Sequence, residues 1–201
     1  MVDRRVGNAK LHGNTPDREL ERPLVFETER ATVVDLLAYD DAGVVDQLRT
    51  KNLLGGLPPL TPKLKRLSID RESGKVHQEQ LTDVGFEFPQ MDWALADGKS
   101  NVVYGAAIAP RGRQLASEIV SIELESSITR KFRDADWIFG EPIFVGKPQR
   151  TAQGDGVLLT EGTRENSSAM FVLDARSLEP LARADFPTAL PLGFHGTFVR
   201  A

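Results

Sequence analysis

Three ionisable residues recur in similar settings and at equal spacing along the chain. Glu87, Glu141 and His195 lie in the stretches TDVGFEFP, WIFGEPIFV and PLGFHGTFV, each one or two residues after a glycine. Glu141 follows Glu87 by 54 residues, and His195 follows Glu141 by 54 residues. Together they could form a metal site, because imidazole suits iron, copper, zinc and nickel and its second ring nitrogen usually donates to a carboxylate. The alternative is that each glutamate forms a salt bridge and His195 is an ordinary core residue.

Most of the chain that must position these residues has the pattern of strands and turns. Three hairpins are predicted, with turns at Ser73–Gly74, at 125–127 and at 175–177. Further strands are predicted in the apolar runs ATVVDLLAY (31–39), NVVYGAAIA (101–109) and GVLLTEG (156–162). One short helix is predicted within 40–56, where apolar residues have helical spacing before a glycine pair.

The hairpins and the three ionisable residues form one repeating pattern. Self-similarity near about 50 residues, with four strand-like segments in each period, is typical of a β-propeller blade. The innermost strands of a propeller line its central channel, so equivalent positions in successive blades converge. The sequence therefore predicts an all-β, partial β-propeller, with an unrelated β-sandwich as the alternative. Gly140 and Gly193 are predicted to allow tight entries into inner strands.

Composition narrows the class of protein. The chain has 201 residues, enough for one domain or a large part of one, and its apolar content of 40% is that of a globular protein. A net charge of −4 without a basic cluster argues against a nucleic-acid partner. The absence of cysteine excludes disulfides and thiolate chemistry.

The N-terminal segment and the hydropathy pattern indicate where in the cell the protein is expected. Residues 1–22 are polar and predicted to be irregular, without the apolar stretch of a signal peptide, and residues 23–201 are predicted to form the blades. No apolar run is long enough for a membrane span. We therefore expect a cytoplasmic protein, with peripheral attachment to a membrane left open.

Several segments resemble the carotenoid cleavage oxygenase family, in the same order, from about Pro23 to the C-terminus. The segments that carry the resemblance are VVDLLAYDDAGVVDQL, PPLTPKLKRLSID, GFEFPQMDW, VVYG, GEPIFV, DGVLLT, VLDARSLEPLARADFP and GFHGTF. The pair formed by EPIFV and, about fifty residues later, GFHGTF is the most specific feature.

The resemblance implies a propeller of about seven blades with Fe(II) on its axis. In this family four histidines hold the iron, and three of them donate hydrogen bonds to glutamates. By position in the motifs, His195 matches the last ligand, and Glu87 and Glu141 match two of these glutamates. The implied chemistry is insertion of O2 across a conjugated C=C bond of a carotenoid, apocarotenoid or related polyene.

The chain departs from the family pattern in its length and in its histidines. Family members are about twice as long, so the chain resembles their C-terminal half. The third ligand is expected just before VVDLLAY, but that place reads PLVFETERAT, without histidine. His12 lies in a polar segment and His77 in a hairpin, so neither is expected to be a ligand.

Two interpretations follow. In the first, the chain is the C-terminal portion of an iron oxygenase, either a truncated gene product or one half of a split enzyme whose partner supplies the missing blades. In the second, it is an inactive binding or structural module, for which a homo-oligomer would cover the open sheet edge. In either case the chain alone is expected to bind Fe(II) weakly and to be inactive.

Overall fold

The computed structural model describes residues 24–47, 49, 61–92, 101–108, 116–191, 193 and 195–199. The predicted irregular segment 1–22, with His12, lies outside the described residues. Of the range 40–56 in which the helix is predicted, residues 48 and 50–56 also lie outside, and α1 (Gly43–Gln47) confirms a short helix in the described part. The remaining regular structure of the described residues is β-strand, as the sequence predicts.

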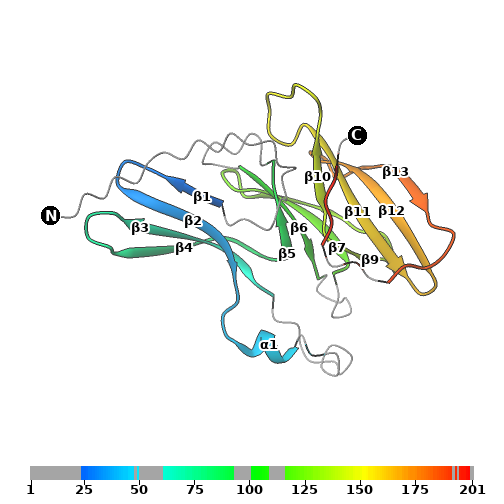
Figure 1. Cartoon of the computed structure of the whole chain (residues 1–201), viewed down its shortest axis with the longest axis horizontal. Helices are drawn as coiled ribbons and strands as arrows, with labels where there is room; N and C mark the ends of the chain where they lie inside the picture. The colour runs from blue at the N-terminus through cyan, green and yellow to red at the C-terminus, as the bar shows by residue number, and fades with distance from the viewer. Residues whose placement is uncertain are drawn as a thin grey trace.

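The strands form three antiparallel sheets that follow one another along the chain (Figure 1). Blade 1 comprises β1 (Leu24–Glu27), β2 (Ala31–Ala38), β3 (Lys63–Asp70) and β4 (Val76–Gly85). Blade 2 comprises β5 (Glu87–Gln90), β6 (Val102–Ala107), β7 (Glu118–Glu123) and β8 (Ile128–Phe132). Blade 3 comprises β9 (Ile138–Phe139), β10 (Ile143–Gly146), β11 (Gly156–Arg164), β12 (Ser167–Asp174) and β13 (Pro180–Asp185). Within each sheet four strands pair in sequence order, which is the meander of a propeller blade.

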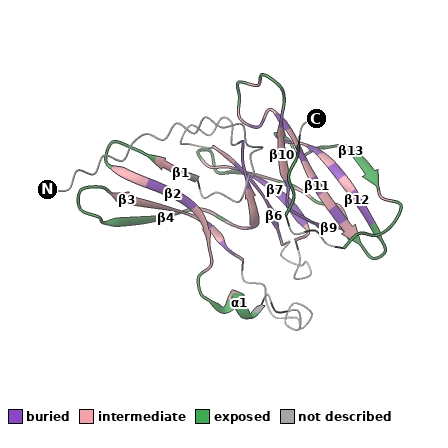
Figure 2. Cartoon of the chain, viewed as in Figure 1, coloured by how far each residue is buried: buried purple, intermediate pink, exposed green. Residues whose placement is uncertain are grey.

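The cores lie between the blades. In β7 the side chains alternate: Ile119 packs in a cluster with blade 3 residues such as Leu158, and Val120 packs in a cluster with Leu64 of blade 1. Both faces of β7 are therefore buried, as its purple colour in Figure 2 shows. In β11 the burial alternates along the strand, so only one of its faces is fully covered. Blade 2 is thus the middle layer of a stack of three.

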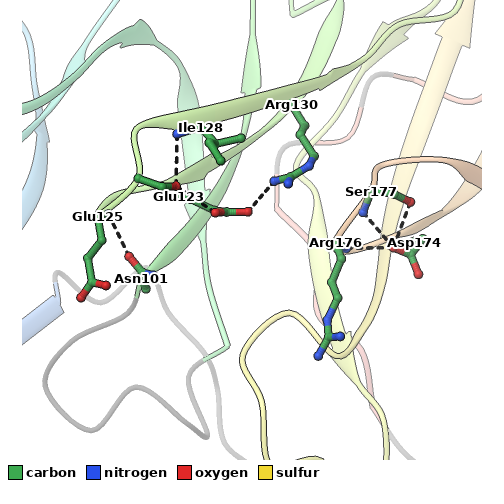
Figure 3. A network of polar contacts seen from close by, with 9 residues as sticks. Asn101, Glu123, Glu125, Ile128, Arg130, Asp174, Arg176 and Ser177 are labelled. Atoms are coloured by element: carbon green, nitrogen blue, oxygen red, sulfur yellow. Dashed lines mark hydrogen bonds and ion pairs between the residues drawn. The ribbon is translucent and has the colours of Figure 1, made fainter.

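The three predicted hairpin turns are confirmed, and they share an Asp/Glu-x-x-Ser sequence. The acidic residue and the serine are joined by hydrogen bonds in the pairs Asp70–Ser73, Glu123–Ser126 and Asp174–Ser177. Each serine hydroxyl also accepts a hydrogen bond from the backbone N–H two residues further on. Figure 3 shows the second and third of these turns. The shared turn is a second signature of the repeat.

These turns predict a loss of stability in acid. Hydrogen bonds from the backbone N–H and the hydroxyl of Ser177 lower the pKa of Asp174. Its stabilising contribution is therefore present above the ordinary aspartate pKa of about 3.9 and is lost as the pH falls through the lowered folded value. We expect Asp174→Asn to lower Tm at pH 7 by about 2–4 °C. Thermal unfolding followed by circular dichroism should show the difference from wild type shrinking as the pH falls below about 3.9, and a constant difference would contradict this.

Candidate functional site

The carboxylate of Glu141 is the centre of a buried polar cluster between blades 2 and 3. Its side chain is 6% exposed. Gln90 Nε2 donates to Oε1 at 2.9 Å, and the backbone N–H of Gly196 donates to Oε2 at 3.1 Å. His195 Nδ1 lies 3.4 Å from the same Oε2. A buried carboxylate is costly unless it is hydrogen-bonded, and these contacts meet that requirement.

The backbone just before β10, which leads into Glu141, is fixed by two hydrogen bonds to the neighbouring strand. The Gly140 N–H donates to the carbonyl of Glu161 at 2.8 Å, and the Thr160 hydroxyl donates to the Gly140 carbonyl at 3.1 Å. Both partners lie on β11, the strand next to β10. These hydrogen bonds fix the backbone position of Glu141 in blade 3 independently of the contacts of its side chain.

Blade 2 reaches the same site through an irregularity in β5. The pairing of β5 with β6 changes register between Glu87 and Gln90, and Phe88 has a φ of 54°. A positive φ is uncommon outside glycine and marks a constrained backbone. The ring of Phe88 meets the ring of His195 edge to face, with centroids 5.6 Å apart. The side chains of Phe88 and Gln90, two residues apart, therefore both contact the cluster.

The C-terminal segment, which contains His195, lies against blade 3 without being a strand in the described residues. It is attached by the Leu190 N–H, which donates to the Ser168 hydroxyl at 2.9 Å, and by the contacts of His195 and Gly196 to Glu141. The side chain of His195 is 44% exposed. The imidazole of His195 is therefore only partly covered.

Two of the predicted site residues, His195 and Glu141, are in contact, and their roles toward a metal stay predictions. Glu87 is half-buried at the start of β5, opposite Ala106, and its role also stays a prediction. His77 is exposed on β4.

Two expectations about local structure are wrong. Glu141 precedes β10 and His195 follows β13, so neither lies on an inner strand, unlike Glu87. A side chain at Gly140 would meet Glu161 at ordinary contact distances of 3.7 and 3.9 Å, so that glycine does not mark a tight entry. At Gly193 a Cβ would lie 2.9 Å from Glu161 Oε2, which is the movable end of a side chain.

Sequence reasoning missed Phe88 and Gln90. Both stand in the same FEFPQ stretch as Glu87. Gln90 is three residues from Glu87, and a regular strand would place residues three apart on opposite faces, so the spacing gave no signal for Gln90.

The described residues do not form a complete iron site. Among them, no group of three or more histidine, aspartate or glutamate side chains could hold a metal ion. They supply one imidazole with a carboxylate beside it, whereas an Fe(II) oxygenase site commonly has three protein ligands. The donor set therefore fits one ligand position and is insufficient alone.

The three blades form part of a β-propeller. His195, in contact with Glu141, is its candidate metal ligand. The family model described as Retinal pigment epithelial membrane protein matches residues 24–200. The chain belongs to this family, that of the carotenoid cleavage oxygenases.

Relatives and a solved structure show the same likeness. A carotenoid-cleaving dioxygenase, mitochondrial, of Mustela putorius furo is 33% identical over 99% of this chain and 45% of its own length. A carotenoid cleavage oxygenase of Mycobacterium tuberculosis is 30% identical over 68% of this chain and 29% of its own length. The cobalt-substituted apocarotenoid oxygenase of Synechocystis matches with a TM-score of 0.76 at 25% identity, over 88% of this chain and 38% of that one. The chain spans less than half the length of these proteins.

No helix in the described part of the chain has the length and apolar character needed to cross a membrane.

Proposed function

We propose that this chain supplies the C-terminal blades and one iron ligand, His195, to a non-heme Fe(II) oxygenase. The proposed reaction is oxidative cleavage of a conjugated C=C bond in a carotenoid or apocarotenoid. The observation that carries the proposal is the contact between His195 Nδ1 and Glu141 Oε2 in a chain that matches the family from residue 24 to 200. Bound Fe(II) would supply the activation of O2.

The chain's own residues prepare the imidazole for this role. Nδ1 is directed at Glu141, so the tautomer with a proton on Nδ1 would donate to the carboxylate and leave the other ring nitrogen as a lone-pair donor. The Gly196 N–H and the Gln90 amide hold the carboxylate in place. Phe88 covers the ring at its edge and keeps an apolar surface there. A polyene substrate has no polar groups along its conjugated part, so an apolar wall suits it.

The missing ligands would come from a partner that covers the open blades. On blade 1, Val33 faces blade 2 and is 4% exposed, whereas Val25 and Val76 lie on the opposite face and are 53% and 60% exposed. A contiguous exposed apolar patch marks an interaction site, and both valines would lie within the face that a partner covers. We propose an N-terminal half as the partner, and a homo-oligomer as the alternative.

A specific observation favours a second function, that of an inactive module. The β1 region, where the resemblance places the third ligand, has the sequence LVFETERA over 24–31 and contains no histidine. In that case the same blades would serve for binding or assembly only.

A graft tests the proposal. Residues 87–201 would replace the matching C-terminal portion of the Mycobacterium tuberculosis relative, so that the remaining ligands come from that protein. We expect the graft to bind about one Fe(II) per chain and to cleave an apocarotenal. His195→Ala in the graft should reduce bound iron and abolish cleavage, with Thr197→Ala on the same segment as the control. A graft that folds and cleaves equally well with His195→Ala would overturn the proposal.

A further inference from the structure

We propose that Gln90 is a positioning residue for His195, acting across the interface between blades 2 and 3 through Glu141. This inference rests on the proposed function, because it concerns the orientation of the imidazole proposed to bind iron. It goes further by naming the residue that fixes the carboxylate. We assign Gln90 no direct contact with the metal or the substrate.

The geometry divides the two oxygens of Glu141 between different partners. Oε1 accepts from Gln90 Nε2 at 2.9 Å, and Oε2 faces both Gly196 N and His195 Nδ1. A carboxylate on a flexible side chain can turn so that neither oxygen faces the imidazole. A donor on Oε1 opposes that movement, so Oε2 stays directed at the imidazole. The shorter contact to Gln90 therefore sets the direction of the longer one to His195.

The chemistry of glutamine suits this task. Gln90 is buried, at 9% exposure, and its amide is a neutral donor. A lysine or arginine at this place would pair with the carboxylate and compete with His195 for its charge. A glutamate there would repel Glu141. A neutral donor holds the carboxylate while leaving its charge available to the imidazole.

The placement of Gln90 is produced by the backbone of β5. Gln90 lies opposite Tyr104 in β6, on the far side of the register change from Glu87. Phe88, at a φ of 54°, lies within that irregular stretch and contacts His195 directly. One strand of blade 2 therefore holds both the ring of His195 and the carboxylate beside it, although Glu141 belongs to blade 3.

The test uses the whole chain without metal and compares Gln90→Met with Gln78→Met. Methionine has about the length of glutamine and no donor, and Gln78 is exposed on β4. Nitrogen-15 spectra of the imidazole rings at a fixed pH near 8 report which ring nitrogen carries the proton, and His195→Ala assigns the signals. In wild type we expect the Nδ1–H form of His195 to dominate. Gln90→Met should shift the tautomer ratio about five-fold toward the Nε2–H form, as loss of one hydrogen bond of about 1 kcal/mol implies.

The outcomes separate this inference from the proposed function. An unchanged tautomer ratio in a folded Gln90→Met chain, with the Gln78→Met chain as reference, would overturn the positioning role. If Gln90→Met does not fold, Gln90→Asn shortens the donor by one methylene while keeping the amide, and the same spectra decide. Failure of the graft to bind iron would overturn the proposed function without changing this metal-free result.

Discussion

Purified by itself, this chain is expected to bind Fe(II) weakly and to cleave no carotenoid. An oxygenase site must hold the metal and keep positions open for O2 and substrate, and a common solution uses two histidines and one carboxylate. The described residues offer one imidazole beside its carboxylate. Metal analysis after anaerobic reconstitution, with a turnover assay on β-carotene or an apocarotenal, should find iron well below one per chain and no aldehyde product.

Glu141 is poorly suited to replace a missing ligand. To swing toward a metal it would have to give up the hydrogen bonds from Gln90 and Gly196 and lose contact with His195. Loss of such an orienting partner typically costs about 10–100-fold in metal affinity or activity. The carboxylate is therefore more stable where it is.

The control for this experiment is His77→Ala, because His77 lies exposed on β4 of blade 1. Stoichiometric iron and an aldehyde product, both abolished by His195→Ala and unaffected by His77→Ala, would show that the chain alone is an enzyme. That result would also remove the need for a partner half.

The blades could be predicted because their signals are local. Each hairpin combines alternating strands with a short polar turn, and the acidic residue and serine of that turn bond to each other within four residues. The equal spacing of Glu141 and His195 correctly indicated that they lie close together. Glu141 lies near the beginning of blade 3, and His195 lies where the chain returns to that blade after β13.

The details of the site could not be predicted because they depend on backbone irregularities. The register change in β5 and the positive φ of Phe88 decide which side chains of FEFPQ contact His195 and Glu141. Position 88 is neither glycine nor proline, so the residue there does not indicate an irregular backbone. The equal spacing of Glu87 therefore indicated the right strand, and Phe88 and Gln90 of the same strand contact the cluster.

The second large effect is expected at the ion pair between Asp92 and Arg150, which joins blade 2 to blade 3. The Asp92 side chain is 1% exposed and that of Arg150 is 16% exposed. Arg150 Nε donates to Asp92 Oδ2 at 2.6 Å, and Nη2 contacts the other carboxylate oxygen. The guanidinium also lies over the ring of Phe144, 5.6 Å from its centroid. The pair spans 58 residues of sequence and links the end of β5 to the turn after β10.

Arg150→Met is expected to lower the free energy of unfolding by about 3–5 kcal/mol, because it leaves a buried carboxylate without its cation. The double variant Asp92→Asn with Arg150→Met should be more stable than Arg150→Met alone, since no charge is then left unpaired. Arg71→Met is the matched control: its partner Glu27 is 68% exposed, and a pair of that kind contributes about 0–1 kcal/mol. Urea unfolding of the four proteins measures these differences. A loss at Arg150 no larger than the loss at Arg71 would mean that this pair does not hold the two blades together.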